Sequence, residues 1–215
     1  MVLKKKKSLL LGITGGIATG KSVVAEMFRE LGAFIIDSDL VSRRVVEPEK
    51  PAWKEIVAYF GEGILLEDRS LNRRLLSEMV FSDPEKRKRL EEYTHPRIRE
   101  EILREIQHHL LKAPEAIIAV IVPLLFEVHW EALFHKTLLI YAPKEIQLQR
   151  LMVRDRISRE RALRIIDSQM PIEEKRLYAD FIIDNSGSLE ETRGQVEKVW
   201  KILQAIRGEL RTKTL

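Results

Sequence analysis

The sequence of 215 residues contains no cysteine. Disulfide bonds, thiolate metal sites and cysteine nucleophiles are therefore excluded, and a reducing cytoplasm is the expected location. Long apolar runs are also missing. The run that follows the basic amino terminus is only about six residues long, too short for a signal peptide or a membrane-spanning helix. We therefore expect a cytoplasmic protein with no membrane partner.

Charge of one sign is not in large excess. The chain has 37 Lys or Arg against 33 Asp or Glu, a net charge of +4. Anionic small molecules explain such a balance as readily as nucleic acid does, and we expect no nucleic-acid partner. Hydrophobic residues make up 45% of the chain, which is enough for a packed core and excludes a disordered protein.

Apolar, β-branched segments alternate with helical patterns along the chain, as is typical of a parallel sheet covered by helices on both faces. Strands are predicted near residues 8–14, 33–37, 116–122, 136–141 and 180–183. The helix after the first strand and the last helix each have an apolar face, formed by Val23, Val24, Met27, Phe28 and Leu31 and by Val196, Val199, Trp200, Leu203 and Ile206.

Two connections are longer than a crossover helix requires. Residues 43–113 contain no good strand and are predicted to form a helical insertion with two apolar stripes. Residues 144–177 begin just after Pro143, are rich in Lys and Arg, and are predicted to form a lid of two short helices. Residues 1–42, 114–143 and 178–215 remain as the core. The stripes are Leu71, Leu75, Leu76, Met79 and Val80, and Ile98, Ile102, Ile106 and Leu110.

The segment Gly15-Gly16-Ile17-Ala18-Thr19-Gly20-Lys21-Ser22 matches the P-loop pattern, with a predicted strand before it and a helix after it. Glycines allow successive backbone N–H groups to converge on phosphate oxygens, and the helix N-terminus adds partial positive charge. Lys21 is expected to bind the β- and γ-phosphates of a nucleotide, and the Ser22 hydroxyl to bind Mg²⁺. The predicted fold is a three-layer α/β/α P-loop NTPase with a five-stranded parallel sheet.

Two further absences narrow the choice among P-loop proteins. The third predicted strand runs into Pro123-Leu124-Leu125-Phe126-Glu127 without the Asp that a motor places against Mg²⁺. The Asn-Lys-x-Asp segment with which GTPases usually read guanine is also missing. Residues 184–187 match Asp-x-x-Gly, but they follow the fifth strand, so we treat the match as chance.

Two carboxylates, Asp37 and Asp39, follow the second strand, whose end should lie beside the phosphate loop. A hydroxyl acceptor needs a hydrogen-bond acceptor to orient it, whereas a monophosphate acceptor needs cations. The pair therefore favours an alcohol acceptor. Asp39 would orient the hydroxyl and take its proton late, and Asp37 would support Mg²⁺, directly or through water. The alternative is that both are helix-cap and turn residues.

Cations of the predicted lid could bind the triphosphate. Gln147, Arg150 and Arg154 share one helix face, so both guanidinium groups could point at the nucleotide, and a closing lid would exclude water. A solvated helix face explains each arginine equally well.

A longer series of motifs resembles the dephospho-CoA kinase family over nearly the whole chain. In chain order they are Gly12-Ile13-Thr14-Gly15-Gly16-Ile17 with Gly20-Lys21-Ser22, Ile36-Asp37-Ser38-Asp39, Leu71-Asn72-Arg73, Val80-Phe81, Leu90-Glu91, Thr94-His95-Pro96-Arg97-Ile98, Pro123-Leu124-Leu125-Phe126-Glu127, Gln147-Leu148-Gln149-Arg150 with Arg154-Asp155, Ser168-Gln169, Lys175, Ala179-Asp180 and Asn185-Ser186-Gly187.

The resemblance implies transfer of the γ-phosphate of ATP to the ribose 3′-hydroxyl of dephospho-CoA, the last step of coenzyme A biosynthesis. It also implies a P-loop core, a helical domain for the CoA moiety and a lid. It assigns Asp39 to activation of the acceptor, Arg150 and Arg154 to the lid, and Asn185 and Gly187 to the turn beside adenine. Thr14, Arg73, His95 and Arg97 are the corresponding candidates for binding dephospho-CoA, with capping of a helix before Pro96 as the alternative for His95.

The chain departs from the family pattern at a few positions. Ala18-Thr19 stands where Gly-Ser is usual, so Ala18 must accept a conformation compatible with a β-carbon. Val23 replaces a common Thr, and Ser38 replaces a frequent Ala. Two other functions stay open. One is another small-molecule kinase with a hydroxyl acceptor, such as a nucleoside kinase. The other is a nucleotide-gated nucleic-acid-binding module, which is supported only by the excess of basic over acidic residues. A monomer or weak homo-oligomer is expected.

Overall fold

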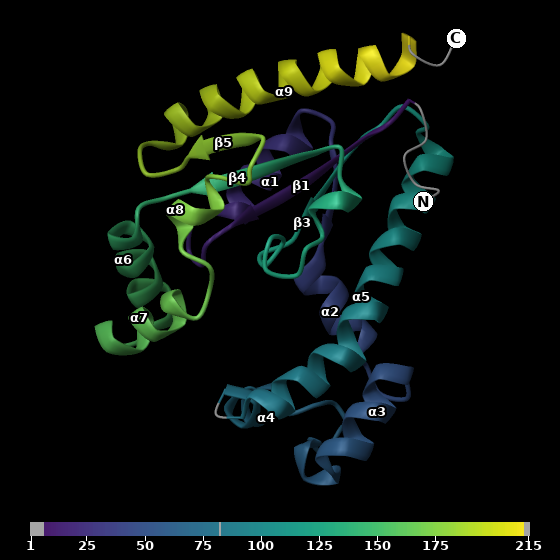
Figure 1. Ribbon diagram of the computed structural model, residues 1–215, viewed down its shortest axis with the longest axis vertical. Coiled ribbons are helices and arrows are strands. Elements are labelled where there is room, and N and C mark those ends of the chain that lie inside the picture. Colours follow the sequence, from purple (N-terminus) through teal and green to yellow (C-terminus); the bar gives the residue numbers. More distant parts are fainter. Residues whose placement is uncertain (1–6, 82, 213–215) are drawn as a thin grey trace. The chain divides into compact units, whose positions relative to one another are not determined.

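In the computed structural model, which describes residues 7–81 and 83–212, five parallel strands form one sheet in the order β2-β3-β1-β4-β5 (Figure 1). This confirms the predicted fold class. Each strand begins and ends within one residue of its predicted position. The strands are β1 (Leu9–Gly15), β2 (Phe34–Asp37), β3 (Ile117–Ile121), β4 (Lys136–Tyr141) and β5 (Phe181–Asp184).

Strand β1 lies at the centre of the sheet, and all seven of its residues are buried. A strand buried on both faces reads as a continuous apolar run, which is why this segment was recognisable in the sequence. Helices α1 (Lys21–Glu30) and α9 (Leu189–Thr212) pack on one face of the sheet. Val23 does not join this core, since it is 44% exposed, and the buried Ala25 is part of it instead.

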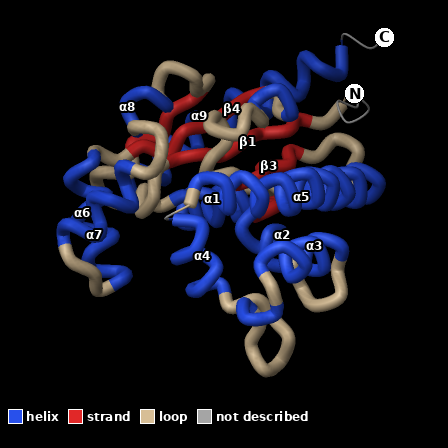
Figure 2. The backbone as a smooth tube through the Cα atoms, turned by 60° about the horizontal axis from the view of Figure 1, so that its bottom comes forward, coloured by secondary structure: helices blue, strands red, loops and turns tan. Residues whose placement is uncertain are grey.

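The carboxyl ends of the strands meet at one edge, where the glycine loop follows β1. Figure 2 shows β4, β1 and β3 side by side. Asp37, the last residue of β2, pairs in register with Ile121 of β3, and Ile121 pairs with Ile13 of β1. Because neighbouring strands lie about 4.8 Å apart, the backbones of Asp37 and Ile13 are separated by roughly 10 Å.

The segment after β4 contains α6 (Lys144–Asp155), α7 (Arg159–Asp167) and the short α8 (Ile172–Lys175), one helix more than predicted. Pro143 precedes α6, and the Ser158 hydroxyl caps α7 by accepting a hydrogen bond from the Arg161 backbone. Leu148, Leu151 and Ala162 form a small core between α6 and α7. Ile17 and Ala18 of the glycine loop pack against this core, so the segment is joined to the loop by apolar contact.

The chain divides into two compact units, and Ser38–Glu105 forms the second. The elements described in it are α2 (Ser38–Val45), α3 (Pro51–Phe60), the 3₁₀ turn η1 (Glu62–Ile64), α4 (Arg73–Phe81) and the part of α5 (Pro84–Lys112) up to Glu105. The division into core, insertion and lid at the bounds expected from the sequence stays a prediction.

Two sequence expectations within this second unit are wrong. Leu71 does not belong to the α4 face, because the Asn72 side chain accepts a hydrogen bond from Leu75 N and α4 begins at Arg73; Leu71 instead forms a bridge with Leu65. Pro96 lies inside the continuous helix α5, so His95 does not cap a helix before it.

Candidate active site

The glycine loop between β1 and α1 contains two residues in the left-handed region. Gly20 has φ 91°, and a β-carbon there would collide with Asn185 Nδ2, so only glycine fits. Ala18 has φ 58°. Its β-carbon is therefore tolerated in a left-handed conformation, at a cost of about 1–2 kcal/mol relative to the right-handed one.

Lys21, the first residue of α1, folds back over the loop. Its Nζ donates hydrogen bonds to the carbonyl oxygens of Gly15 and Gly16, at 3.0 and 2.8 Å. Ser22 is exposed in the first turn of the same helix. The ammonium and the hydroxyl therefore both lie at the helix N-terminus, where backbone N–H groups favour an anion.

The turn after β5 closes the other side of the loop. Asn185 donates from Nδ2 to the carbonyl of Thr19 at 2.8 Å and accepts at Oδ1 from the Thr192 hydroxyl of α9 at 2.9 Å. Arg150 of α6 donates from Nη2 to the Asn185 carbonyl at 2.9 Å. Gly187 lies two residues further on, in the exposed part of the same turn. The structure thus brings Arg150 and Asn185 to the phosphate loop.

The other two residues predicted on the lid face differ in their contacts. Gln147 is buried, donates to the Ala142 carbonyl at 2.8 Å, and lies so close to Gly16 that a β-carbon there would collide with it. Arg154 pairs with its neighbour Asp155, at 2.7 and 3.0 Å, and this hydrogen bond lowers the pKa of the Asp155 carboxyl. Arg150 and Arg154 both lie in α6, one helical turn apart, and the role of Arg154 stays a prediction.

The two acidic candidates lie in different units. Asp37 ends β2 at the same sheet edge as the glycine loop, and Asp39 is exposed in the first turn of α2. The described residues contain no cluster of three or more His, Asp or Glu that could hold a metal ion by itself. One hydroxyl, Ser22, and one carboxylate, Asp37, nevertheless suit Mg²⁺, which keeps several waters and binds mainly through substrate phosphates.

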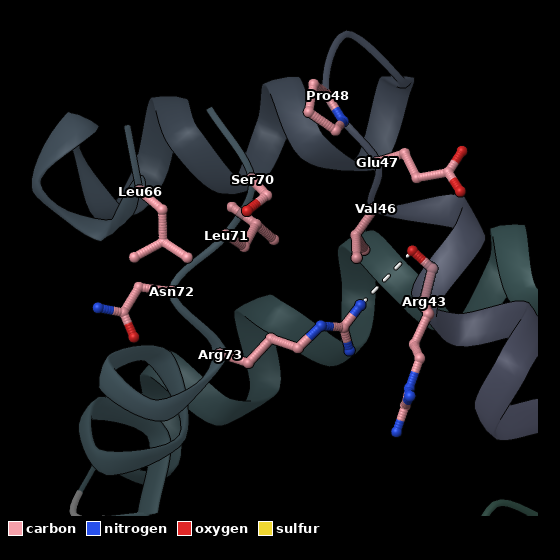
Figure 3. Close-up of a pocket in the computed structure, with 9 residues that line it drawn as sticks. All are labelled: Arg43, Val46, Glu47, Pro48, Leu66, Ser70, Leu71, Asn72 and Arg73. Carbon is pink, nitrogen blue, oxygen red and sulfur yellow. Dashed lines mark hydrogen bonds between the residues drawn. The ribbon is translucent and has the colours of Figure 1, made fainter. Parts of the chain in front are cut away.

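A cavity of about 380 Å³ lies in the helical unit, between α2, the η1–α4 connection and the start of α4. Arg43 and Arg73 line it together with Val46, Leu66 and Leu71 (Figure 3). Burial, and then the charge of Arg43, lower the pKa of Arg73. Glu47 also lines the cavity, and Arg73 Nη2 donates to the Arg43 carbonyl at 3.5 Å (Figure 3). The lining therefore offers two cations, one carboxylate and several apolar side chains to a ligand. Arg43 was missed in the sequence, although it follows Asp39 by one helical turn.

The remaining candidates for acceptor binding already have protein partners. Arg97 pairs with Glu55 at 2.8 Å and donates to the Tyr93 carbonyl at 2.6 Å. Thr14 is buried and donates from its hydroxyl to the Pro123 carbonyl at 3.1 Å. His95 is partly buried in α5. Their contact with an acceptor stays a prediction.

A buried group around Lys175 has no counterpart among the predicted site residues. Lys175 of α8 is fully buried; its Nζ lies 2.7 Å from Glu127 Oε1 and donates to the Pro123 carbonyl at 3.0 Å. Nearby, the backbone N–H of Ile17 in the glycine loop donates to Gln169 Oε1 at 3.0 Å. Ser168-Gln169 and Lys175 were visible only as motifs without a role.

A central parallel strand that leads through a glycine loop into a helix, with a lysine over the loop, defines a P-loop nucleotide-binding protein. The sequence profile described as "Dephospho-CoA kinase" matches residues 9–191. The chain belongs to the dephospho-CoA kinase family.

Individual relatives agree with the profile. The dephospho-CoA kinase of Listeria monocytogenes serotype 4b (strain F2365) is 47% identical over 86% of this chain and 92% of its own length. The dephospho-CoA kinase of Halalkalibacterium halodurans is 44% identical over 91% of this chain and 98% of its own length. Among solved structures, TT1252 from Thermus thermophilus has a TM-score of 0.78 at 37% identity, covering 91% of this chain and 97% of its own. Dephospho-CoA kinase from Campylobacter jejuni has a TM-score of 0.67 at 36% identity, with 89% and 95% covered.

No transmembrane helix is present within residues 7–81 and 83–212, because every helix there is too short or too polar to cross a bilayer.

Proposed function

We propose that this chain transfers the γ-phosphoryl group of ATP to the ribose 3′-hydroxyl of dephospho-CoA, giving CoA and ADP. The observation that carries the proposal is the phosphate loop, with Lys21 Nζ on the Gly15 and Gly16 carbonyls, in a chain of this family. On nucleotide binding, the ammonium exchanges these two carbonyls for β- and γ-phosphate oxygens. The loop N–H groups and the α1 N-terminus bind the remaining phosphate charge.

Asp39 orients the acceptor in this proposal. Its carboxylate accepts a hydrogen bond from the 3′-hydroxyl, whose oxygen forms a bond to the γ-phosphorus as the bond to the β–γ bridging oxygen breaks. The hydroxyl proton passes to Asp39 late in the reaction, and ADP leaves. Its position directly after β2, the strand that ends at the same sheet edge as the loop, supports this role.

Magnesium and the cationic side chains complete the proposal. When bound, Mg²⁺ neutralises phosphate charge, and Ser22 and Asp37 would hold it, directly or through water. Arg150, which is already beside the loop, adds a guanidinium group on the nucleotide side. The cavity lined by Arg43 and Arg73 receives the anionic and apolar parts of dephospho-CoA. Thr14, His95, Arg97 and Arg154 stay as candidates for further contacts.

The acceptor is tested by following ADP formation with dephospho-CoA, nucleosides, pantetheine derivatives and nucleoside monophosphates in turn. We expect turnover with dephospho-CoA alone, and phosphorus NMR should place the new phosphate on the 3′-oxygen. Equal turnover with nucleosides would favour a nucleoside kinase instead. ADP formation that depends on added DNA or RNA would favour a nucleotide-gated binding module.

The role of Asp39 is tested by Asp39→Asn. Removing the carboxylate should lower kcat by about 10²–10⁴-fold, the usual range for a general base, while the Kd for ATP changes by less than about twofold. Glu62→Gln, an exposed carboxylate in the same unit, is the matched control and should keep full activity. Full activity of Asp39→Asn would exclude the role proposed for Asp39.

We also propose that the enzyme works in the cytoplasm as a monomer or weak homo-oligomer. The lack of cysteine supports this location. Sedimentation at several protein concentrations measures the assembly state, and fractionation of cells measures the location.

A further inference from the structure

The loop between α7 and α8 is hydrogen-bonded to the phosphate loop. Gln169 is 152 positions away from Ile17 in sequence, yet its Oε1 accepts the Ile17 backbone N–H at 3.0 Å. Backbone N–H groups of such a loop are the donors that phosphate oxygens use. The Gln169 amide therefore lies within the set of groups that surrounds the bound phosphates.

The position of the contact along the loop indicates which phosphate is involved. Lys21 Nζ lies on the carbonyls of Gly15 and Gly16, directly before Ile17, and this ammonium is the group that reaches the β- and γ-phosphates. The Ile17 end of the loop is thus the end nearer the terminal phosphate. The N–H groups at the start of α1 lie at the opposite end of the loop.

The oxygen and the nitrogen of the Gln169 side-chain amide differ in their hydrogen bonding. Its Oε1 is held by Ile17, and among residues 7–81 and 83–212 its Nε2 has no hydrogen-bond partner. Because the amide is planar, holding the oxygen also fixes the direction in which the two Nε2 hydrogens point.

The backbone beside Gln169 is also fixed. The N–H of Met170 donates to Glu127 Oε1 at 3.2 Å, and the same oxygen lies 2.7 Å from the fully buried Lys175 Nζ. Lys175 and the Thr14 hydroxyl both donate to the Pro123 carbonyl, at 3.0 and 3.1 Å. These bonds connect the Gln169 segment to β1 and to the segment after β3. The donor is therefore positioned before the nucleotide binds, which reduces the entropy lost when it engages a ligand.

We infer that Gln169 is a further catalytic residue, and the inference rests on the proposed function. While Oε1 stays on the Ile17 N–H, Nε2 donates a hydrogen bond to a terminal phosphate oxygen of ATP. No proton moves to or from the amide. The hydrogen bond stabilises charge on the equatorial oxygens of the phosphoryl group during transfer. ADP has no γ-phosphate and therefore cannot accept this hydrogen bond from Gln169 Nε2.

The variant Gln169→Ala tests the assignment, with kcat, KM for ATP and the Kd values of ATP and ADP as measurements. Loss of one hydrogen bond to a charged group should lower kcat/KM for ATP by about tenfold to a hundredfold. Binding of ADP should change by less than about twofold, since ADP does not use the donor. Gln169→Glu keeps an acceptor atom but removes the donor and adds negative charge, so its loss should be larger.

The control is Gln204→Ala, an exposed glutamine of α9, and thermal unfolding of each variant reports whether the fold is kept. Unchanged kcat/KM, or equal loss of ATP and ADP affinity, would overturn the inference. Tighter ATP binding by Gln169→Ala would do so as well, because Gln169 would then compete with the nucleotide for Ile17. The ATP and ADP affinities are measured without an acceptor, so they test Gln169 even if the unaltered protein does not phosphorylate dephospho-CoA.

Discussion

Lys175 is a single side chain on which the segment beside the phosphate loop depends. Lys175→Met removes the cation that faces Glu127, whose Oε2 is buried and has no hydrogen-bond partner among the described residues. Leaving a buried carboxylate without its cation should lower the free energy of unfolding by about 3–5 kcal/mol. For a chain of this size, the melting temperature should fall by roughly 6–20 °C in thermal unfolding.

Two further variants separate charge from packing in this test. Lys201→Met, an exposed lysine of α9, should leave the melting temperature nearly unchanged. Adding Glu127→Gln to Lys175→Met removes the unpaired charge and should restore more than half of the loss. If the single and double variants melt together, lost packing rather than the ion pair explains the effect.

Ala18 shows why one residue of the loop could not be predicted. Its position in the P-loop follows from the spacing of Gly15, Gly20 and Lys21, but alanine does not reveal the sign of its φ angle. In the structure φ is 58°, and the Ala18 methyl packs against the small core of Leu148, Leu151 and Ala162. Ala18 is partly buried, and because a fully buried methyl group contributes about 0.8 kcal/mol, the contact offsets part of the left-handed strain. That contact joins residues far apart in sequence, so the local pattern does not contain it.

The contact between β4 and β5 should make the stability of the protein depend on pH. Asp180, just before β5, accepts hydrogen bonds from Lys136 Nζ at 2.7 Å, from Thr137 N at 2.8 Å and from the Thr137 hydroxyl at 3.0 Å. Burial alone would raise the pKa of Asp180, but the bonds from Lys136 and Thr137 outweigh it and hold the pKa below its ordinary value of 3.8.

Because the folded pKa is depressed, this carboxylate contributes stability that is fully present above pH 3.8 and is lost as the pH falls through the folded value. Asp180→Asn should therefore melt below the unaltered protein at neutral pH, and the difference should shrink as the pH falls below 3.8. Thermal unfolding across this range is the measurement. A difference that stays constant with pH would show that the charge of Asp180 has no part in joining the strands.

Helix α5 shows where a pattern of residues misleads. Pro96 lacks the N–H that would bond the carbonyl four residues earlier, so the sequence suggested a helix boundary. The helix continues from Pro84 to Lys112. The Thr94 hydroxyl donates to the Leu90 carbonyl, and Arg97 donates to the Tyr93 carbonyl while pairing with Glu55 of α3. The ion pair with Glu55 joins this turn of α5 to α3, and the spacing of residues in the sequence does not reveal such a contact.

The charge of the whole molecule bears on how it meets its substrates. The chain carries a net charge of +4, and both ATP and dephospho-CoA are anions. Steering of anions by a positive field weakens as salt screens it. Raising the ionic strength about tenfold with KCl should lower kcat/KM for dephospho-CoA by at least about threefold, with a much smaller change in kcat. Sucrose at equal osmolality is the control, and an equal fall in kcat would show that salt acts on the chemical step instead.

Across the whole chain, the features that could be predicted from the sequence depend on local spacing and on apolar patterns. The strands, the glycine loop and the helical character of the insertion follow from apolar periodicity and the spacing of glycines. Contacts between distant polar residues do not. Gln169 lies 152 residues from Ile17, and nothing near either residue indicates the bond. Arg154 shows a smaller gap: helical spacing does not reveal that its guanidinium group pairs with the adjacent Asp155.

The turn after β5 also affects how the protein ages in storage. An asparagine followed by serine loses its amide when the next backbone nitrogen attacks the side-chain carbonyl carbon. Here the Ser186 N–H is hydrogen-bonded to Asp184 Oδ1 at 2.9 Å, and the buried Asn185 amide is bonded at both ends, to Thr19 and Thr192. Deamidation at this position would put a new carboxylate against the phosphate loop. The same bonds that hold the turn in place also slow this damage, so the enzyme should keep an uncharged amide here throughout its working life.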